Sequence, residues 1–158
     1  MKCFSLNELA RSYGLVESPD GRVSTQMLRK RLAVAIDEPA VIHGHLFPHA
    51  FDKHYVERVV VLRCDPTVLK GRLRARGYPS RQVVDNLEAE LIGLVSSEAF
   101  EAFGPTATFE VDTTHSTPVE AASSALKVIE GDAEPAPRID WMANYDSGRK
   151  LRSLLSMA

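Results

Sequence analysis

Apolar positions follow two different periods along this chain of 158 residues. Short runs rich in β-branched residues predict strands, and stretches with apolar residues three or four positions apart predict helices. Strands are expected at residues 2–6, 40–42, 58–64 and 108–114. Helices are expected at residues 7–15, 25–36, 66–76, 80–103 and 118–131. Because the two kinds of segment alternate, the sequence predicts the α/β class with a mostly parallel sheet.

Local signals mark where several of these segments begin. Asn7 is expected to cap the first helix, and Asp65 followed by proline is typical of a helix N-terminus. Thr117 and Glu120 have the spacing of a capping box. The run RVVVLRC at residues 58–64 is continuous and β-branched, which predicts a strand buried on both faces of a parallel sheet.

Composition narrows the class of protein. A formal net charge of -2, with 44% hydrophobic and 25% charged residues, is ordinary for a globular domain, so no direct DNA binding and no membrane are expected. The two cysteines, Cys3 and Cys64, have no metal-binding spacing, and the N-terminus lacks a signal-peptide core. Both features indicate a cytoplasmic protein. We expect one domain over residues 1–131 and a loosely held tail over residues 132–158, with Trp141 as its anchor.

Polar residues follow three of the expected strands. They are the loop His43-Gly44-His45, then Asp65, then the run Asp112-Thr113-Thr114. In open α/β sheets, ligands bind beyond the carboxyl ends of the strands. The sequence therefore predicts that a binding site lies near these three segments.

A basic stretch follows the strongest strand. Residues 70–81 contain five basic side chains and no acid: Lys70, Arg72, Arg74, Arg76 and Arg81. One interpretation is a solvated helix face. However, Arg72, Arg74 and Arg76 do not share one helical face, and no acid at helical spacing pairs with them. Because arginine binds phosphate oxygens at two points, the stretch also fits a lid that closes on a polyphosphate.

The segment VVVLRCDPTVLKGRLRARGYPSRQVVDNLEAE resembles the strand, helix and lid of the CINAP-type adenylate kinases, also called adenylate kinase isoenzyme 6. Further segments match in the family's order: LNELARSYGLV, VIHGHL, FEVDTT and ALKVIEG. The resemblance covers residues 3–131 and implies a P-loop-kinase-like parallel sheet flanked by helices. It also implies a segment that binds the nucleoside monophosphate at about residues 5–27 and a lid at about residues 75–85.

The resemblance implies a function and four site residues. The family transfers the γ-phosphoryl group of ATP to AMP or a related nucleoside monophosphate, with Mg²⁺ accompanying ATP. In eukaryotes it is linked to maturation of the small ribosomal subunit, which makes a small-subunit ribosomal protein a candidate partner. By position, Arg76 matches a lid arginine that binds ATP and acts in catalysis, and Lys127 matches a lysine near ATP. Arg11 matches an arginine that contacts the monophosphate, and His45 matches the histidine of a Walker B-like catalytic loop.

Each assignment has a simpler alternative. Arg11 could be an ordinary arginine on a helix surface, and Lys127 could favour its helix dipole. His45 could be hydrogen-bonded within its loop. Asn86 and Glu90 on the long helix are interpreted as structural or solvated.

The sequence departs from the family at two points. It contains no G-x-x-x-x-G-K-[ST] motif, and His43 stands where many members have an acidic residue. The chain begins where the family's second strand is expected, so we expect a natural product that starts upstream. In the family's strand order 2-3-1-4-5, the segments AVI and RVVVL would flank the first strand, so here they should stay apart or pair directly. The alternative functions are a non-catalytic nucleotide-binding or ribosome-assembly module, or a remnant without a ligand.

Overall fold

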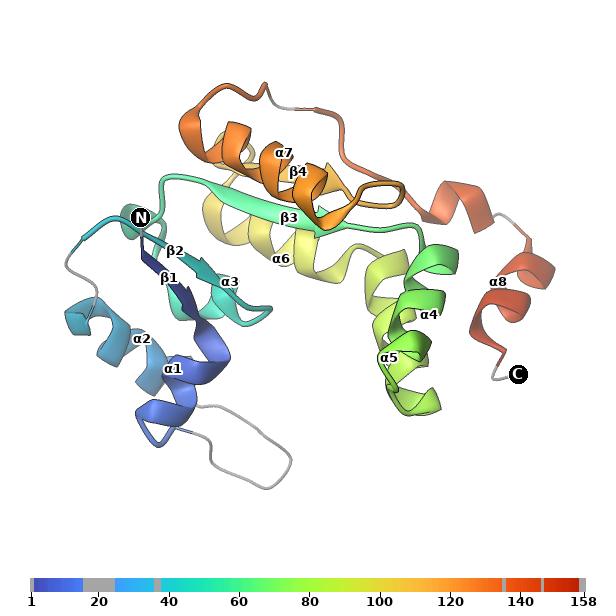
Figure 1. Ribbon diagram of the computed structural model, residues 1–158, viewed down its shortest axis with the longest axis horizontal. Coiled ribbons are helices and arrows are strands. Elements are labelled where there is room, and N and C mark those ends of the chain that lie inside the picture. Colours follow the sequence, from blue (N-terminus) through green and yellow to red (C-terminus); the bar gives the residue numbers. More distant parts are fainter. Residues whose placement is uncertain (1, 16–24, 36–37, 135, 146, 157–158) are drawn as a thin grey trace. The chain divides into compact units, whose positions relative to one another are not determined.

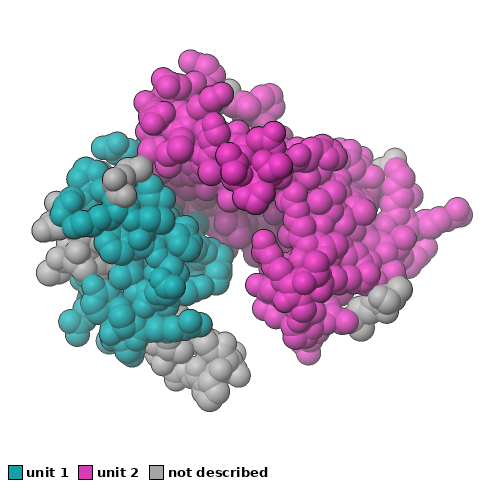
Figure 2. Space-filling model, viewed as in Figure 1, with its two compact units in different colours: residues 1–57 teal, residues 58–158 magenta. Residues whose placement is uncertain are grey.

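The computed structural model describes residues 2–15, 25–35, 38–134, 136–145 and 147–156. The chain divides into two compact units, residues 1–57 and residues 58–158 (Figure 2). Each unit contains a pair of parallel strands with helices packed around it, which confirms the expected α/β class (Figure 1).

The first unit is built on the parallel pair β1 (Lys2–Ser5) and β2 (Ala40–His43). Its helices are α1 (Leu6–Ser12), α2 (Thr25–Ala35), α3 (Phe47–Ala50) and the 3₁₀ turn η1 (Lys53–Tyr55). Its core consists of small and aliphatic side chains, namely Leu6, Ala10, Leu15, Leu28 and Ala50. The rings of Phe47 and Phe51 stack at 4.8 Å between centroids beside this core.

The second unit is built on the parallel pair β3 (Val59–Arg63) and β4 (Thr108–Asp112). Its helices are α4 (Pro66–Ala75), α5 (Ser80–Leu91), α6 (Leu94–Phe103), α7 (Pro118–Glu130), the 3₁₀ turn η2 (Met142–Tyr145) and α8 (Gly148–Leu155). Helices α6 and α7 cover opposite faces of this strand pair (Figure 1). Helices α4 and α5 form a hairpin that follows the carboxyl end of β3.

Several local signals have the expected structural result. Asp65 caps α4 by accepting a hydrogen bond from the backbone N–H of Thr67 at 2.7 Å. Thr117 and Glu120 form a complete capping box at the start of α7. The first helix is capped by Ser5 instead of Asn7, because the Ser5 hydroxyl accepts from the third backbone N–H of that helix.

Two expectations for the second unit are wrong. The segment 80–103 is not one helix, because Gly93 adopts a left-handed conformation with φ of 63° and separates α5 from α6. Strand β3 is not buried on both faces, since Leu62 is 57% exposed whereas Val61 is buried. Alternating side chains therefore bury one face of β3 more completely than the other.

The tail is also more ordered than expected. Trp141 is buried, as the sequence indicated, and Leu154 is buried with it. Both pack against Leu73 of α4 and Leu87 of α5. The description of residues 132–158 as loosely held is therefore wrong for this part of the tail.

The expected strand order 2-3-1-4-5 places the first two strands of this chain side by side, and likewise its last two. Both of these pairs are present. β1 pairs only with β2, and β3 only with β4, among the residues that the structure describes. Over the same described residues, no helix is both long enough and apolar enough to cross a membrane. Residues 16–24 of the expected monophosphate-binding segment, and Ile36 at the end of the second expected helix, lie outside the described residues.

Candidate functional site

In the first unit, the candidate site lies at the carboxyl ends of β1 and β2. The strand register places Ser5 opposite His43, so the loop that contains His45 leaves the sheet beside the start of α1. Gly44 has a φ of 149°, and a Cβ atom there would lie 2.8 Å from the Cβ of Leu6. Only glycine fits this close approach, so the position of the loop against α1 depends on Gly44.

Arg11 and His45 are both exposed in this unit. Arg11 occupies the last turn of α1, and His45 follows the loop glycine. Their side chains are accessible to a ligand, and their roles remain predictions.

In the second unit, the carboxyl ends of β3 and β4 are joined by short hydrogen bonds. The backbone N–H of Asp65 donates to the hydroxyl of Thr114 at 2.8 Å. The Asp112 carboxylate accepts from the backbone N–H and the hydroxyl of Thr114, at 2.8 Å and 2.5 Å. Asp65 and Asp112 are therefore held near each other at this edge, as the sequence predicted.

Directly before this edge lies a buried charge network that the sequence reasoning did not find. The Arg63 side chain is 2% exposed and forms ion pairs with Glu90 of α5 at 2.8 Å and with Glu110 of β4. The Arg63 guanidinium also donates to the backbone carbonyls of Glu90 at 3.0 Å and Ile139 at 3.2 Å. The available signal was a charged residue inside an apolar strand pattern, since a buried charge must be paired.

The pKa values in this network favour the charged forms. Burial opposes the charge of Arg63, but hydrogen bonds and charges from Glu90 and Glu110 raise the pKa of Arg63 overall. Burial alone would raise the pKa of Glu110, but hydrogen bonds from Ser96, Ile139 and Arg63 lower the pKa overall. Arg63 and Glu110 are therefore ionised at neutral pH, and their pairing belongs to the structure of the unit.

The basic stretch separates into structural and exposed members. Arg72 donates to the carbonyls of Thr113 at 2.9 Å and Thr114 at 3.0 Å, and so ties α4 to the loop after β4. Lys70 donates to the Leu154 carbonyl at 2.6 Å. The expectation that the whole stretch is left for a phosphate is therefore wrong for these two residues.

Arg76 is an exposed member of the stretch. It caps the C-terminus of α4, and Gly77 follows it in a left-handed conformation with φ of 75°. Ten helical residues at about 1.5 Å each place Arg76 roughly 15 Å along the helix axis from the Asp65 cap. The side chain is thus exposed at the end of α4, beside a glycine in the left-handed conformation, and its role in a lid stays a prediction.

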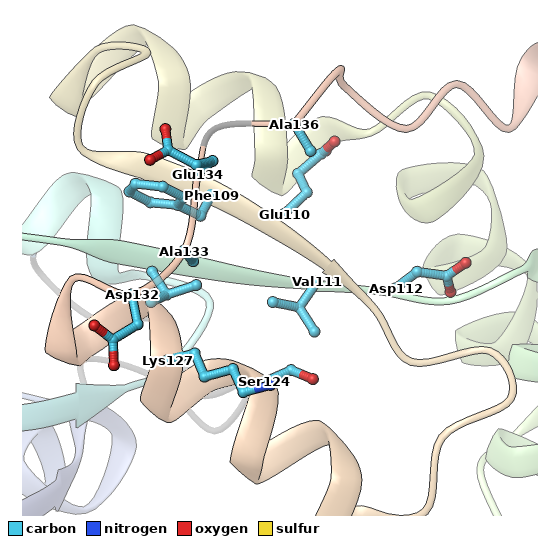
Figure 3. A pocket seen from close by; sticks show the side chains of 11 residues that line it. Phe109, Glu110, Val111, Asp112, Ser124, Lys127, Asp132, Ala133, Glu134 and Ala136 are labelled. Atoms are coloured by element: carbon cyan, nitrogen blue, oxygen red, sulfur yellow. The ribbon is translucent and has the colours of Figure 1, made fainter.

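Lys127 lies in a different part of the second unit. It lines a cavity of about 370 Å³ with β4 residues Phe109 and Val111 and with Asp132 and Glu134 (Figure 3). Arg76 does not line this cavity.

The metal-binding capacity of the described residues is small. They contain no group of three or more His, Cys, Asp or Glu side chains that could hold a metal ion. Mg²⁺ in phosphoryl transfer is commonly held by one or two carboxylates together with substrate phosphates. The Asp65 and Asp112 carboxylates already accept hydrogen bonds from Thr67 and Thr114.

Comparison with known proteins gives a consistent set of relatives. A protein of Natronomonas pharaonis named "Putative adenylate kinase" is 36% identical over 134 residues, which are 83% of this chain and 77% of that protein. A protein of the same name from Archaeoglobus fulgidus is 30% identical over 153 residues, covering 92% and 80%. A third, from Methanothermobacter thermautotrophicus, is 47% identical over 91 residues, covering 58% and 51%. No protein-family model matches the chain.

Proposed function

The chain belongs to the adenylate kinase family of these archaeal relatives, and we propose that it serves the transfer of the γ-phosphoryl group from ATP to AMP or a related nucleoside monophosphate. The observation that carries the proposal is the exposed Arg76 on a glycine-hinged turn at the outer end of α4. Residues 75–85 would form the lid, and residues 5–27 would bind the monophosphate. In this proposal the reaction takes place in the cytoplasm.

The proposed roles follow from the charge and position of each side chain. Arg76 would bind the triphosphate and stabilise the charge that develops on the transferred phosphoryl group. Arg11 would hold the phosphate of AMP, and His45 would line the catalytic loop. Lys127 would contact ATP through the cavity along β4, which Asp132 and Glu134 also line.

The chemistry requires little covalent participation by the protein. Phosphoryl transfer depends mainly on positioning of the two nucleotides and on charge stabilisation. Mg²⁺ bound with ATP would neutralise phosphate charge. The short hydrogen bonds among Asp65, Asp112 and Thr114 keep the edge of the sheet rigid for this purpose.

The sequence also favours a second candidate function. Because His43 stands where many members have an acid, the second candidate is a module that binds a nucleotide or a small-subunit ribosomal protein without turnover. In that case the exposed lid arginines would contact phosphate or an acidic partner, and no ADP would form.

An experiment that adds a phosphate-binding loop to the chain distinguishes the two functions. A strand, a G-x-x-x-x-G-K-[ST] loop and a helix are joined ahead of Met1, and ADP formation from ATP and Mg²⁺ is measured with and without AMP. We expect AMP-dependent ADP formation, and Arg76→Ala should lower this rate by on the order of 10², as loss of a charge-stabilising group does.

The matched control is Lys53→Ala, an exposed cation of η1 that should leave the rate unchanged. A folded protein that binds ATP and forms no ADP with AMP would establish the non-catalytic function instead. An unchanged rate in Arg76→Ala would remove Arg76 from the site.

A further inference from the structure

The apolar side of the α4–α5 hairpin is covered by the C-terminal segment of the chain. Leu73 of α4 and Leu87 of α5 are buried together with Trp141 and Leu154 from the C-terminal segment. Figure 1 shows α8 beside this hairpin, and contacts between α5 and α8 place the two helices together. The C-terminal segment, residues 138–145 and 147–156, thus completes the core that fixes the hairpin.

Polar contacts attach this segment at the base of the hairpin. The indole N–H of Trp141 donates to the Glu90 carboxylate at 2.9 Å, and the backbone N–H of Ile139 donates to the Glu110 carboxylate at 2.5 Å. The same Glu90 oxygen accepts from the Arg63 guanidinium and from the backbone N–H of Cys64 at 3.1 Å. One carboxylate therefore joins α5, the end of β3 and the C-terminal segment.

A second attachment lies farther along α4. The Lys70 ammonium group donates to three carbonyls at the end of α8, at 2.6 Å to Leu154, 3.0 Å to Ser156 and 3.5 Å to Ser153. The last carbonyls of a helix lack partners within the helix and carry partial negative charge, so a cation there is favourable. Lys70 is six residues before Arg76 on the same chain segment, so this contact restrains the half of α4 that leads to the lid turn.

We propose that this C-terminal segment acts as a brace that positions the lid turn at residues 76–79. The brace holds the hairpin at its base through Glu90 and nearer the turn through Lys70. Arg76 itself is exposed, so its position depends on how firmly α4 and α5 are held. The role of Arg76 in binding ATP rests on the proposed function. The role of the brace in holding the hairpin does not.

The brace can be tested without nucleotide by amide hydrogen exchange of the full chain. Lys70→Met removes the three carbonyl contacts and keeps the aliphatic stem, and Trp141→Phe removes the bond to Glu90 and keeps an aromatic ring. Loss of a hydrogen bond to a charged group should speed exchange in residues 72–91 by about tenfold or more in Lys70→Met. Trp141→Phe should act mainly near Glu90. The control is Arg149→Met, an exposed residue of α8 that should change nothing in the hairpin.

Kinetics then test the positioning role. In the phosphotransferring protein with the added loop, Lys70→Met should raise the KM for ATP several-fold and leave the KM for AMP unchanged, because only the lid is loosened. Unchanged hydrogen exchange in both variants would overturn the brace. Faster exchange with an unchanged KM for ATP would overturn its positioning role. If the parent protein has no kinase activity, the proposed function fails, while the exchange result still decides whether the brace exists.

Discussion

The two ends of the α4–α5 hairpin use arginine in opposite ways. At the base, Arg63 is 2% exposed and its guanidinium is surrounded by two carboxylates and two carbonyls. At the tip, Arg76 is exposed beside Gly77. The charge of Arg63 is paired within the protein, whereas the charge of Arg76 is exposed to solvent. Charge at the base therefore determines geometry, and charge at the tip is the part available for a ligand.

Arg72 and Lys70 show that the boundary between the two ends lies within the basic stretch. Both donate to backbone carbonyls of neighbouring segments. Their contacts explain why positive charge gathers here without acidic partners on the same helix. Carbonyl groups at a loop and at a helix terminus take the place of carboxylates.

The largest expected effect comes from breaking the base. Arg63→Met should lower the free energy of unfolding of the second unit by about 3–5 kcal/mol, because the buried Glu110 and the partly buried Glu90 would lose their cation. Denaturant unfolding followed by the fluorescence of Trp141, which is the one tryptophan of the sequence and lies in this unit, measures the loss. Arg81→Met, at an exposed position, is the control. A loss similar to that of the control would mean that the network is not important for stability.

A smaller effect is expected from pH. The pKa of Glu110 is lowered in the folded protein, so its ionised form contributes stability above the ordinary value near 4.5, and this contribution is lost as pH falls through the folded-state pKa. Glu110→Gln should be less stable than the parent at pH 7, by on the order of 1 kcal/mol or more, and the difference should shrink as pH is lowered below about 4.

Unfolding curves at several pH values give this difference directly. Glu101→Gln, at an exposed position of α6, should show no such change with pH. A difference between Glu110→Gln and the parent that stays constant from pH 7 to pH 3 would contradict ionisation of Glu110 as its cause.

The sequence predicted the features that depend on neighbouring residues. The caps at Asp65 and Thr117 and the strand at β3 follow from short patterns, and the structure contains them. It did not predict the network at Arg63, because the two carboxylate partners lie 27 and 47 residues away.

At Gly93 the φ of 63° favours glycine and ends α5, whereas the apolar residues on both sides keep helical spacing, so the periodicity did not reveal the break. The site residues divide similarly. The exposure of Arg76 on a glycine-containing turn follows from the local sequence, but the structural use of Arg72 and Lys70 depends on segments far along the chain.

The smallest effect on stability is expected at the tip. Arg76→Ala should change the free energy of unfolding by no more than about 0.5 kcal/mol, because the side chain is exposed and its backbone, with φ of −84° and ψ of 0°, suits alanine equally well. The same unfolding experiment measures it beside Arg63→Met. A loss above 1 kcal/mol would show that Arg76 is a structural residue like Arg72, and a lower phosphotransfer rate in this variant could then be explained by unfolding. A small loss combined with the lower rate would assign the charge at the tip to ligand binding, because the two measurements separate holding the fold from contacting phosphate.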